Sequence, residues 1–140
     1  MQTLPDGLIV ILKRACPTCT LIEPVLAQLA RGSRPVTVVV QDTADFDVGK
    51  GEQILDADLA LSWQLDCEIV PTLIQRQGGT EIDRTYGWFR EDWEQLSGIS
   101  GLGPDLPASR PGCGSKTQDP GVAERLAVRF GAVTFASREV

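Results

Sequence analysis

The chain has 140 residues, of which 42% are hydrophobic and 23% are charged, and its formal net charge is -6. This size suits one globular domain with a core of its own. The acidic balance argues against nucleic acid as a partner, because phosphate binding needs a basic surface. The sequence contains no histidine, which excludes Cys–His catalysis, histidine-ligated metals and imidazole acid–base chemistry.

The first residues predict a protein that is neither exported nor inserted in a membrane. Residues 1–7 contain no Lys or Arg, and the apolar run that follows ends at Lys13 and Arg14. That run is too short for a signal peptide or a membrane span. We therefore expect a cytoplasmic location, where a Cys-x-x-Cys pair is more often catalytic or metal-binding than a structural disulfide.

The first half of the chain predicts two parallel strands joined by a helix. Residues 8–13 form a continuous apolar run, which predicts a strand buried on both faces. Cys16-Pro17-Thr18-Cys19 follows, and apolar residues then recur at helical spacing up to residue 31. Pro24 should bend this helix. Residues 36–40 predict a second buried strand, which the strand–helix–strand order makes parallel to the first.

The middle of the chain predicts a weak helix and then a β-hairpin. Residues 42–58 are acidic and are expected to form a solvated face, with a helical pattern running from Ile54 to Trp63. Residues 69–74 and 82–86 flank Gly78-Gly79, which is typical of a hairpin turn. The next three apolar positions lie on one face of a helix: Phe89, Trp93 and Leu96. The three tryptophans, Trp63, Trp88 and Trp93, are expected in the core or in groove walls.

The last part of the chain predicts an extension to the domain. Residues 98–118 contain five glycines and three prolines, which favours an irregular linker. Asp119-Pro120 is a helix start, and residues 132–136 alternate like a strand. We expect a first domain at 1–98 and, at 99–140, a linker plus a helix–strand extension. The extension would pack on the same domain or on a homodimer partner.

Four features, in this order, resemble the thioredoxin superfamily. They are Cys16-Pro17-Thr18-Cys19 at a strand-to-helix junction, Pro24 five positions later, Val70-Pro71-Thr72, and Gly87 after the hairpin. The resemblance covers about residues 7–98. It implies an α/β, thioredoxin-like fold with a central mixed β-sheet flanked by helices. It also implies that the Val70–Pro71 peptide bond is cis and packs beside the cysteines.

The chain departs from the thioredoxin pattern at three places. The family's N-terminal strand and helix are missing, and the C-terminal helix and strand would take their place. Ala15 stands where the family usually has an aromatic residue. Val10 stands where it has a buried acid, so no carboxylate is there to assist proton transfer from the second thiol.

The motif predicts a thiol–disulfide oxidoreductase that reduces protein disulfides. Cys16 would be the nucleophile, with its pKa lowered by unpaired helix amides and the helix dipole, and Lys13 or Arg14 could assist. Cys19 would resolve the mixed disulfide. No cofactor or metal is expected, and an upstream thiol reductant would regenerate the dithiol. The substrate groove is expected to contain Ala15, Pro17, Thr18, Val70, Pro71, Gly87 and Trp88.

Several alternatives remain open. A structural zinc site would need two more thiolates, and Cys67 and Cys113 do not form a second Cys-x-x-Cys. Cys67 is expected to be a small buried side chain or an accessory thiol. Cys113, between two glycines, could pair with Cys67, resolve a mixed disulfide, or be an exposed bystander. The alternative function is a redox-responsive binding or scaffold protein, in which the Cys-x-x-Cys pair switches a partner interface without turnover.

Overall fold

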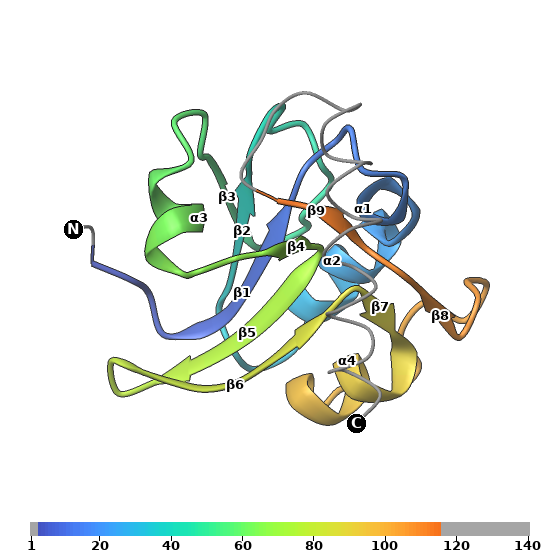
Figure 1. Ribbon diagram of the computed structural model, residues 1–140. Helices are drawn as coiled ribbons and strands as arrows, with labels where there is room; N and C mark the ends of the chain where they lie inside the picture. Colours follow the sequence, from blue (N-terminus) through green and yellow to red (C-terminus); the bar gives the residue numbers. More distant parts are fainter. Residues whose placement is uncertain (1–2, 116–140) are drawn as a thin grey trace.

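A five-stranded mixed sheet forms the centre of the computed structural model, which describes residues 3–115 (Figure 1). Its strand order is β3-β2-β1-β5-β6. β1 (Gly7–Leu12), β2 (Val36–Val40) and β3 (Glu52–Leu55) run parallel to one another. β5 (Thr72–Gln77) is antiparallel to β1, and β6 (Thr80–Tyr86) is antiparallel to β5. The predicted α/β class with a mixed central sheet is confirmed at this level.

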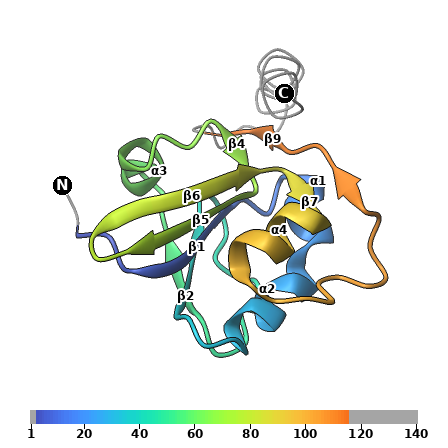
Figure 2. The same ribbon diagram turned by 90° about the horizontal axis from the view of Figure 1, so that it is seen from below.

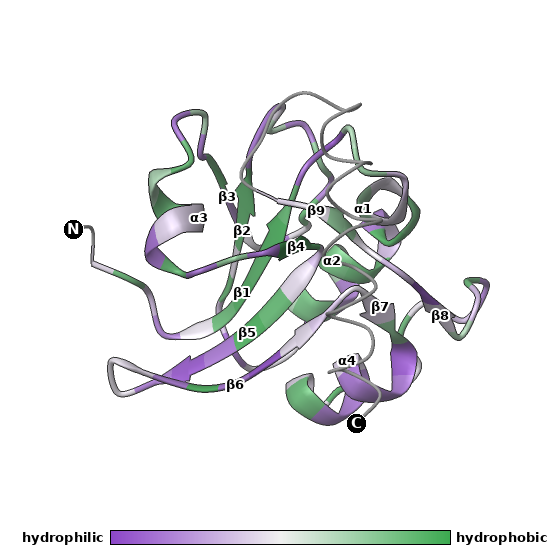
Figure 3. Cartoon of the chain, in the orientation of Figure 1, coloured by the Kyte–Doolittle hydropathy of each residue, from purple (hydrophilic) through white to green (hydrophobic). Residues whose placement is uncertain are grey.

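Helices cover both faces of this sheet. α1 (Pro17–Leu21), α2 (Glu23–Ala30) and α4 (Arg90–Ser97) lie on one side, and α3 (Ala60–Gln64) lies on the other (Figure 2). This sandwich explains why every residue of β1 and β2 is buried. Strands covered on both faces need side chains that are apolar without alternation. The hydrophobic colouring is accordingly concentrated on the central strands (Figure 3).

The predicted bent helix consists of two short helices. α1 ends at Leu21, Ile22 caps it, and Pro24 lies in the first turn of α2. At that position the missing amide of proline removes no hydrogen bond that α2 requires. The chain therefore changes direction at Ile22 rather than bending around Pro24.

Two predictions for residues 43–66 are wrong. Ile54 and Leu55 belong to β3, an edge strand paired with β2, and helical geometry begins only at Ala60. Strand pairing with the long buried β2 overrides the weak helical pattern. Trp63 has 62% of its surface exposed and is neither core nor groove wall.

Residues 98–115 are largely irregular, as their glycines and prolines predict, but they contain two short strands that pair with the rest of the domain. β8 (Ser109–Arg110) pairs with β7 (Trp88–Phe89), and β9 (Cys113–Gly114) pairs with β4 (Ile69–Val70). The Arg90 guanidinium holds the preceding stretch by donating to the carbonyl oxygens of Leu102 (2.9 Å) and Gly103 (2.8 Å). We call residues 107–115 the cover segment.

The helix and strand predicted after residue 119 lie outside the described residues, as does their proposed packing. Within residues 3–115, no helix is both long enough and apolar enough to cross a membrane.

Candidate thiol site

Cys16 and Cys19 lie at the junction between β1 and α1, where the sequence pattern placed them. Cys16 is the N-cap of α1 and has an extended backbone, so its sulfur turns back over the first helical turn. The Cys19 amide donates a hydrogen bond to Cys16 Sγ at 3.4 Å. Neither side chain is exposed to solvent.

The segment before β5 meets this junction from the other side. The Val70–Pro71 peptide bond is cis, as predicted. The Cys16 thiol donates to the Val70 carbonyl oxygen at 3.7 Å, which joins positions 54 residues apart. The Pro71 carbonyl oxygen in turn accepts from the Gly87 amide at 2.8 Å. Three of the four features that carried the family resemblance therefore meet at one place.

Cys113 is a third thiol of the same site. In the antiparallel pairing of β4 with β9, Cys113 lies opposite Val70, the residue whose carbonyl oxygen accepts from Cys16. The Cys113 thiol is close enough to Cys16 to act on its pKa. Cys113 is buried, so the expectation of an exposed bystander is wrong. The sequence signal was the Pro-Gly-Cys-Gly stretch, whose glycines permit close backbone approach.

The cover segment is attached along its whole length. Trp88 Nε1 donates to the Pro107 carbonyl oxygen at 2.7 Å, and Thr18 Oγ1 donates to the Pro111 carbonyl oxygen. Beyond Cys113, the Ser115 amide donates to the Glu68 carbonyl oxygen at 3.0 Å. A side chain at Gly112 would collide with the Val70 carbonyl oxygen, so glycine is required there.

The predicted substrate groove is thus assembled but covered. Thr18, Val70 and Trp88 each bond to or pair with the cover segment, and all three are buried. Pro71 and Gly87 are buried as well, whereas Ala15 is half-buried and Pro17 is exposed. Residues of the same chain, the cover segment, therefore occupy the place where a substrate chain was expected to bind.

Lys13 is the charged group buried against the thiols. Its side chain is 0% exposed, and the neighbouring Cys16, Cys113 and Cys19 act on its charge. Burial lowers the pKa of Lys13, and these sulfurs counteract part of that effect. Arg14 instead pairs with Glu23 (3.1 Å) and Asp45 (3.0 Å). Of the two basic residues predicted to assist, Lys13 is the one at the site.

The pKa of Cys16 is raised, not lowered as expected. The interaction with the Cys113 thiol favours the thiolate of Cys16, as does the hydrogen bond from the Cys19 amide, but the interaction with the Cys19 thiol and burial outweigh them and raise the pKa. Burial in apolar surroundings penalises a charge on sulfur. With the cover segment in place, Cys16 is therefore held as a thiol.

Asp42 is a supporting residue that the sequence interpretation missed. Its carboxylate accepts from the amides of Arg14 (2.7 Å) and Ala15 (2.9 Å), which fixes the loop before Cys16. The acidic stretch was interpreted as a solvated face. The available signal was position: Asp42 follows the end of β2, next to the end of β1, so parallel pairing brings it to this loop.

Cys67 fits the simpler of its two interpretations. It is fully buried, and its thiol donates to the Ile69 carbonyl oxygen at 3.2 Å. The four cysteines form no disulfide in this structure. In the described part of the chain, no group of three or more His, Cys, Asp or Glu residues is arranged to hold a metal ion.

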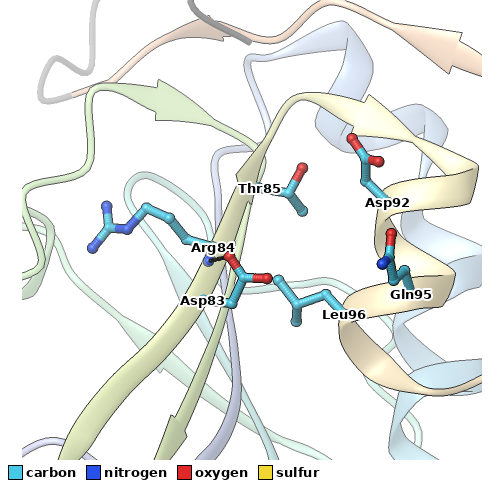
Figure 4. Close-up of a pocket in the computed structure, with 6 residues that line it drawn as sticks. All are labelled: Asp83, Arg84, Thr85, Asp92, Gln95 and Leu96. Atoms are coloured by element: carbon cyan, nitrogen blue, oxygen red, sulfur yellow. Dashed lines mark hydrogen bonds between the residues drawn. The ribbon is translucent and has the colours of Figure 1, made fainter. Parts of the chain in front are cut away.

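A pocket of about 160 Å³ between β6 and α4 contains none of the cysteines. In Figure 4 the Arg84 side chain points away from the other residues that line this pocket. Its guanidinium pairs with Glu81 at 2.6 Å. What remains in the pocket is acidic and polar: Asp83, Thr85, Asp92 and Gln95, with Leu96 beside them. It contains no thiol, and its one cation, Arg84, is paired with Glu81, so the thiol site is the stronger candidate.

Comparison of the chain with family models, with curated proteins and with solved structures finds no match. The function must therefore be argued from the chemistry of the site.

Proposed function

We propose that this protein is a thiol–disulfide oxidoreductase with a thioredoxin-like fold, in which Cys16 is the nucleophile and Cys19 the resolving thiol. The observation that carries the proposal is the placement of both thiols within one turn at the start of α1, with the Cys19 amide bonded to Cys16 Sγ at 3.4 Å. A thiolate formed on Cys16 would keep that amide as a donor. Protein disulfides in a reducing compartment such as the cytoplasm would be its substrates.

The reaction would proceed by two exchanges. The Cys16 thiolate attacks one sulfur of a substrate disulfide, so that a Cys16–substrate bond forms and one substrate thiolate leaves. Cys19 then loses its proton and attacks Cys16 Sγ, which releases the second substrate thiolate. The substrate gains two electrons and two protons, and the protein is left with a Cys16–Cys19 disulfide. An upstream thiol reductant would restore the dithiol.

Lys13 would supply the electrostatic help that the chain lacks at Val10. Val10 is fully buried in β1 and brings no carboxylate to the second thiol. The Lys13 ammonium group, buried among the sulfurs, would instead stabilise whichever sulfur carries the negative charge. A buried ammonium with a lowered pKa can also accept and release a proton more readily than an exposed one.

The second candidate function is a redox-responsive switch, and the covered groove is what favours it. Cys16 is 0% exposed, so a substrate disulfide can reach it only after the cover segment moves. Oxidation of the thiols could then alter how residues 107–115 are held, and with it a partner surface, without turnover.

Turnover of a model disulfide separates the two functions. The reduced protein should reduce oxidised glutathione catalytically in the presence of an excess dithiol, and Cys16→Ser should lower the rate by at least about a thousandfold. Cys67→Ser, another buried cysteine replaced in the same way, is the matched control and should keep most of the activity. Equal rates for Cys16→Ser and the wild type would overturn the enzyme proposal.

A further inference from the structure

Cys16 has a cysteine on each side, and only one of the two belongs to the Cys-x-x-Cys motif. Cys16 donates to the Val70 carbonyl oxygen at 3.7 Å, and Cys113 lies opposite Val70 in the β4–β9 pairing. On the other side, the Cys19 amide donates a hydrogen bond to Cys16 Sγ at 3.4 Å. Cys16 therefore has two candidate partners, one on each side.

We propose that Cys113 is a third exchanging thiol, which forms a disulfide with Cys16 and thereby locks the cover segment over the site. This inference rests on the proposed function, since that reaction supplies the disulfide which Cys113 attacks. It adds a second thiol that can resolve a mixed disulfide on Cys16. It also makes access to the site depend on whether the Cys16–Cys113 disulfide is formed or reduced.

Cys16 and Cys113 lie next to each other across one backbone position. Cys16 Sγ contacts the Val70 carbonyl oxygen at 3.7 Å, Cys113 is the strand partner of Val70, and both cysteines are buried. The Cys113 thiol is close enough to Cys16 to act on its pKa. A disulfide between them would need the sulfurs at about 2.05 Å. Cys67, by contrast, donates to the Ile69 carbonyl oxygen at 3.2 Å.

Hydrogen bonds on both sides of Cys113 hold its backbone in this position. On one side, the Pro111 carbonyl oxygen accepts from Thr18 Oγ1, a residue inside the motif. On the other, the Ser115 amide donates to the Glu68 carbonyl oxygen (3.0 Å), and Ser115 Oγ accepts from Gln41 Nε2 (2.7 Å). Anchors two residues away on each side hold the Cys113 backbone against β4.

The backbone at Gly112 packs tightly against β4. Gly112 lies so close to the Val70 carbonyl oxygen and the Ile69 side chain that no Cβ could be placed there. This close approach brings the following residue, Cys113, level with Val70. A segment that only filled space would not need a glycine at this contact.

The exchange step balances without any added oxidant. Starting from the Cys16–Cys19 disulfide, Cys113 loses its proton and attacks Cys16 Sγ. The Cys16–Cys113 bond forms as the Cys16–Cys19 bond breaks, and Cys19 leaves as a thiolate that takes up a proton. One disulfide replaces another, so no electrons enter or leave the protein. Reduction by the upstream thiol would open the lock.

Oxidised glutathione provides the test, with variants that remove one resolving thiol at a time. In Cys19→Ser, Cys16 should attack glutathione, and Cys113 should then displace it. The product should be two hydrogens lighter than the reduced protein, with a Cys16–Cys113 link found by peptide mapping. In Cys19→Ser/Cys113→Ser the glutathione adduct on Cys16 should last at least about tenfold longer, because the intramolecular thiol is gone.

The matched control is Cys19→Ser/Cys67→Ser, which should resolve the adduct as fast as Cys19→Ser. Circular dichroism of each variant, and Cys113→Ala in place of Cys113→Ser, separate loss of the thiol from loss of the fold. An adduct that persists equally with and without Cys113 would overturn this inference and leave the proposed function intact.

Absence of any adduct on Cys16 would instead overturn the proposed function. Diamide, which oxidises neighbouring thiols without a nucleophilic attack on glutathione, then decides the inference separately. A Cys16–Cys113 disulfide in Cys19→Ser would support it, and its absence would contradict it.

Discussion

The thiol site has two sides that are built in different ways. One side, residues 13–21, is continuous in sequence: the end of β1, a loop fixed by Asp42, and the first turn of α1. The other side, the cover segment, comes from a stretch more than 80 residues away and is held by two short ladders, β7–β8 and β4–β9. The first side carries the proposed chemistry, and the second decides whether anything can reach it.

The two sides also differ in their type of contact. Cys16 and Cys19 belong to the hydrophobic core cluster and Lys13 is buried, whereas Cys113 is the part of the cover segment that reaches the core. The cover segment is held largely through backbone carbonyls and amides, with Ser109 and Arg110 exposed. Short ladders of this kind open at lower free energy than core strands. We therefore expect the side formed by residues 13–21, the motif side, to stay closed while the side formed by the cover segment, the cover side, opens more readily.

The largest expected effect is on the pH dependence of Cys16 reactivity. Because the pKa of Cys16 is raised in the closed structure, few molecules carry the thiolate at pH 7, and that fraction grows about tenfold per pH unit. Alkylation of Cys16 by iodoacetamide should keep accelerating above pH 9. The same cysteine in urea-unfolded protein should level off, since an ordinary thiol has a pKa of about 8.5.

The same shift affects stability. A raised pKa in the folded state favours folding at pH values below the pKa of the unfolded thiol, and this contribution is lost as the pH rises. The free energy of unfolding should therefore fall in alkaline solution. A native alkylation profile that levels off below pH 8 would show that the pKa is lowered, as the sequence predicted, and would contradict the closed site.

Opening the cover side alone should have the next largest effect. In Gly112→Val, the new side chain would meet the Val70 carbonyl oxygen and the Ile69 side chain, and β9 should separate from β4. Alkylation of Cys16 at pH 8 should rise about tenfold, which corresponds to about 1.4 kcal/mol of opening free energy. Circular dichroism should change little, because the five-stranded sheet is not touched.

Ala108→Val is the matched control for that experiment. Ala108 is exposed in the same segment, so a valine there has room and should leave the alkylation rate within about twofold of the wild type. If both variants behave alike, or if Gly112→Val leaves Cys16 protected, the cover segment does not limit access.

The motif side was predictable from sequence, and the cover side was not, for a physical reason. Strands β1 and β2 are buried on both faces, so their apolar runs are long and unbroken, and the Gly78-Gly79 turn marks the hairpin. β8 and β9 contain two residues each, too few to show a period of two. Their pairing is set by backbone groups, which every sequence has, and by a glycine that looks like a linker residue.

The roles of Lys13 and Arg14 show the same limit at the level of side chains. Both follow β1, and the sequence could not say which one turns inward. Asp42 and Glu23 settle this: Asp42 fixes the Arg14 amide at 2.7 Å, and Glu23 draws the Arg14 guanidinium outward at 3.1 Å. Lys13 is left on the buried side, among the sulfurs. The orientation of Lys13 and Arg14 thus depends on Asp42 and Glu23, which lie elsewhere in the chain.

The smallest expected effect distinguishes these two basic residues within the motif side. Lys13→Met keeps the length of the side chain and removes its charge, so the thiolates lose a buried cation that acts on them. The rate of disulfide reduction at pH 7 should fall about three- to tenfold, and the pH profile should move to higher pH. Arg14→Met is the control: it breaks the pairs with Glu23 and Asp45, which lie partly in solvent and contribute at most about 1 kcal/mol. The rate should therefore stay close to that of the wild type.

Stability supplies an independent readout, because a buried ammonium group has a desolvation cost that methionine does not. Lys13→Met should thus be at least as stable as the wild type while being slower, whereas slower turnover together with a lower melting temperature would point to a structural role for Lys13 and against an electrostatic one.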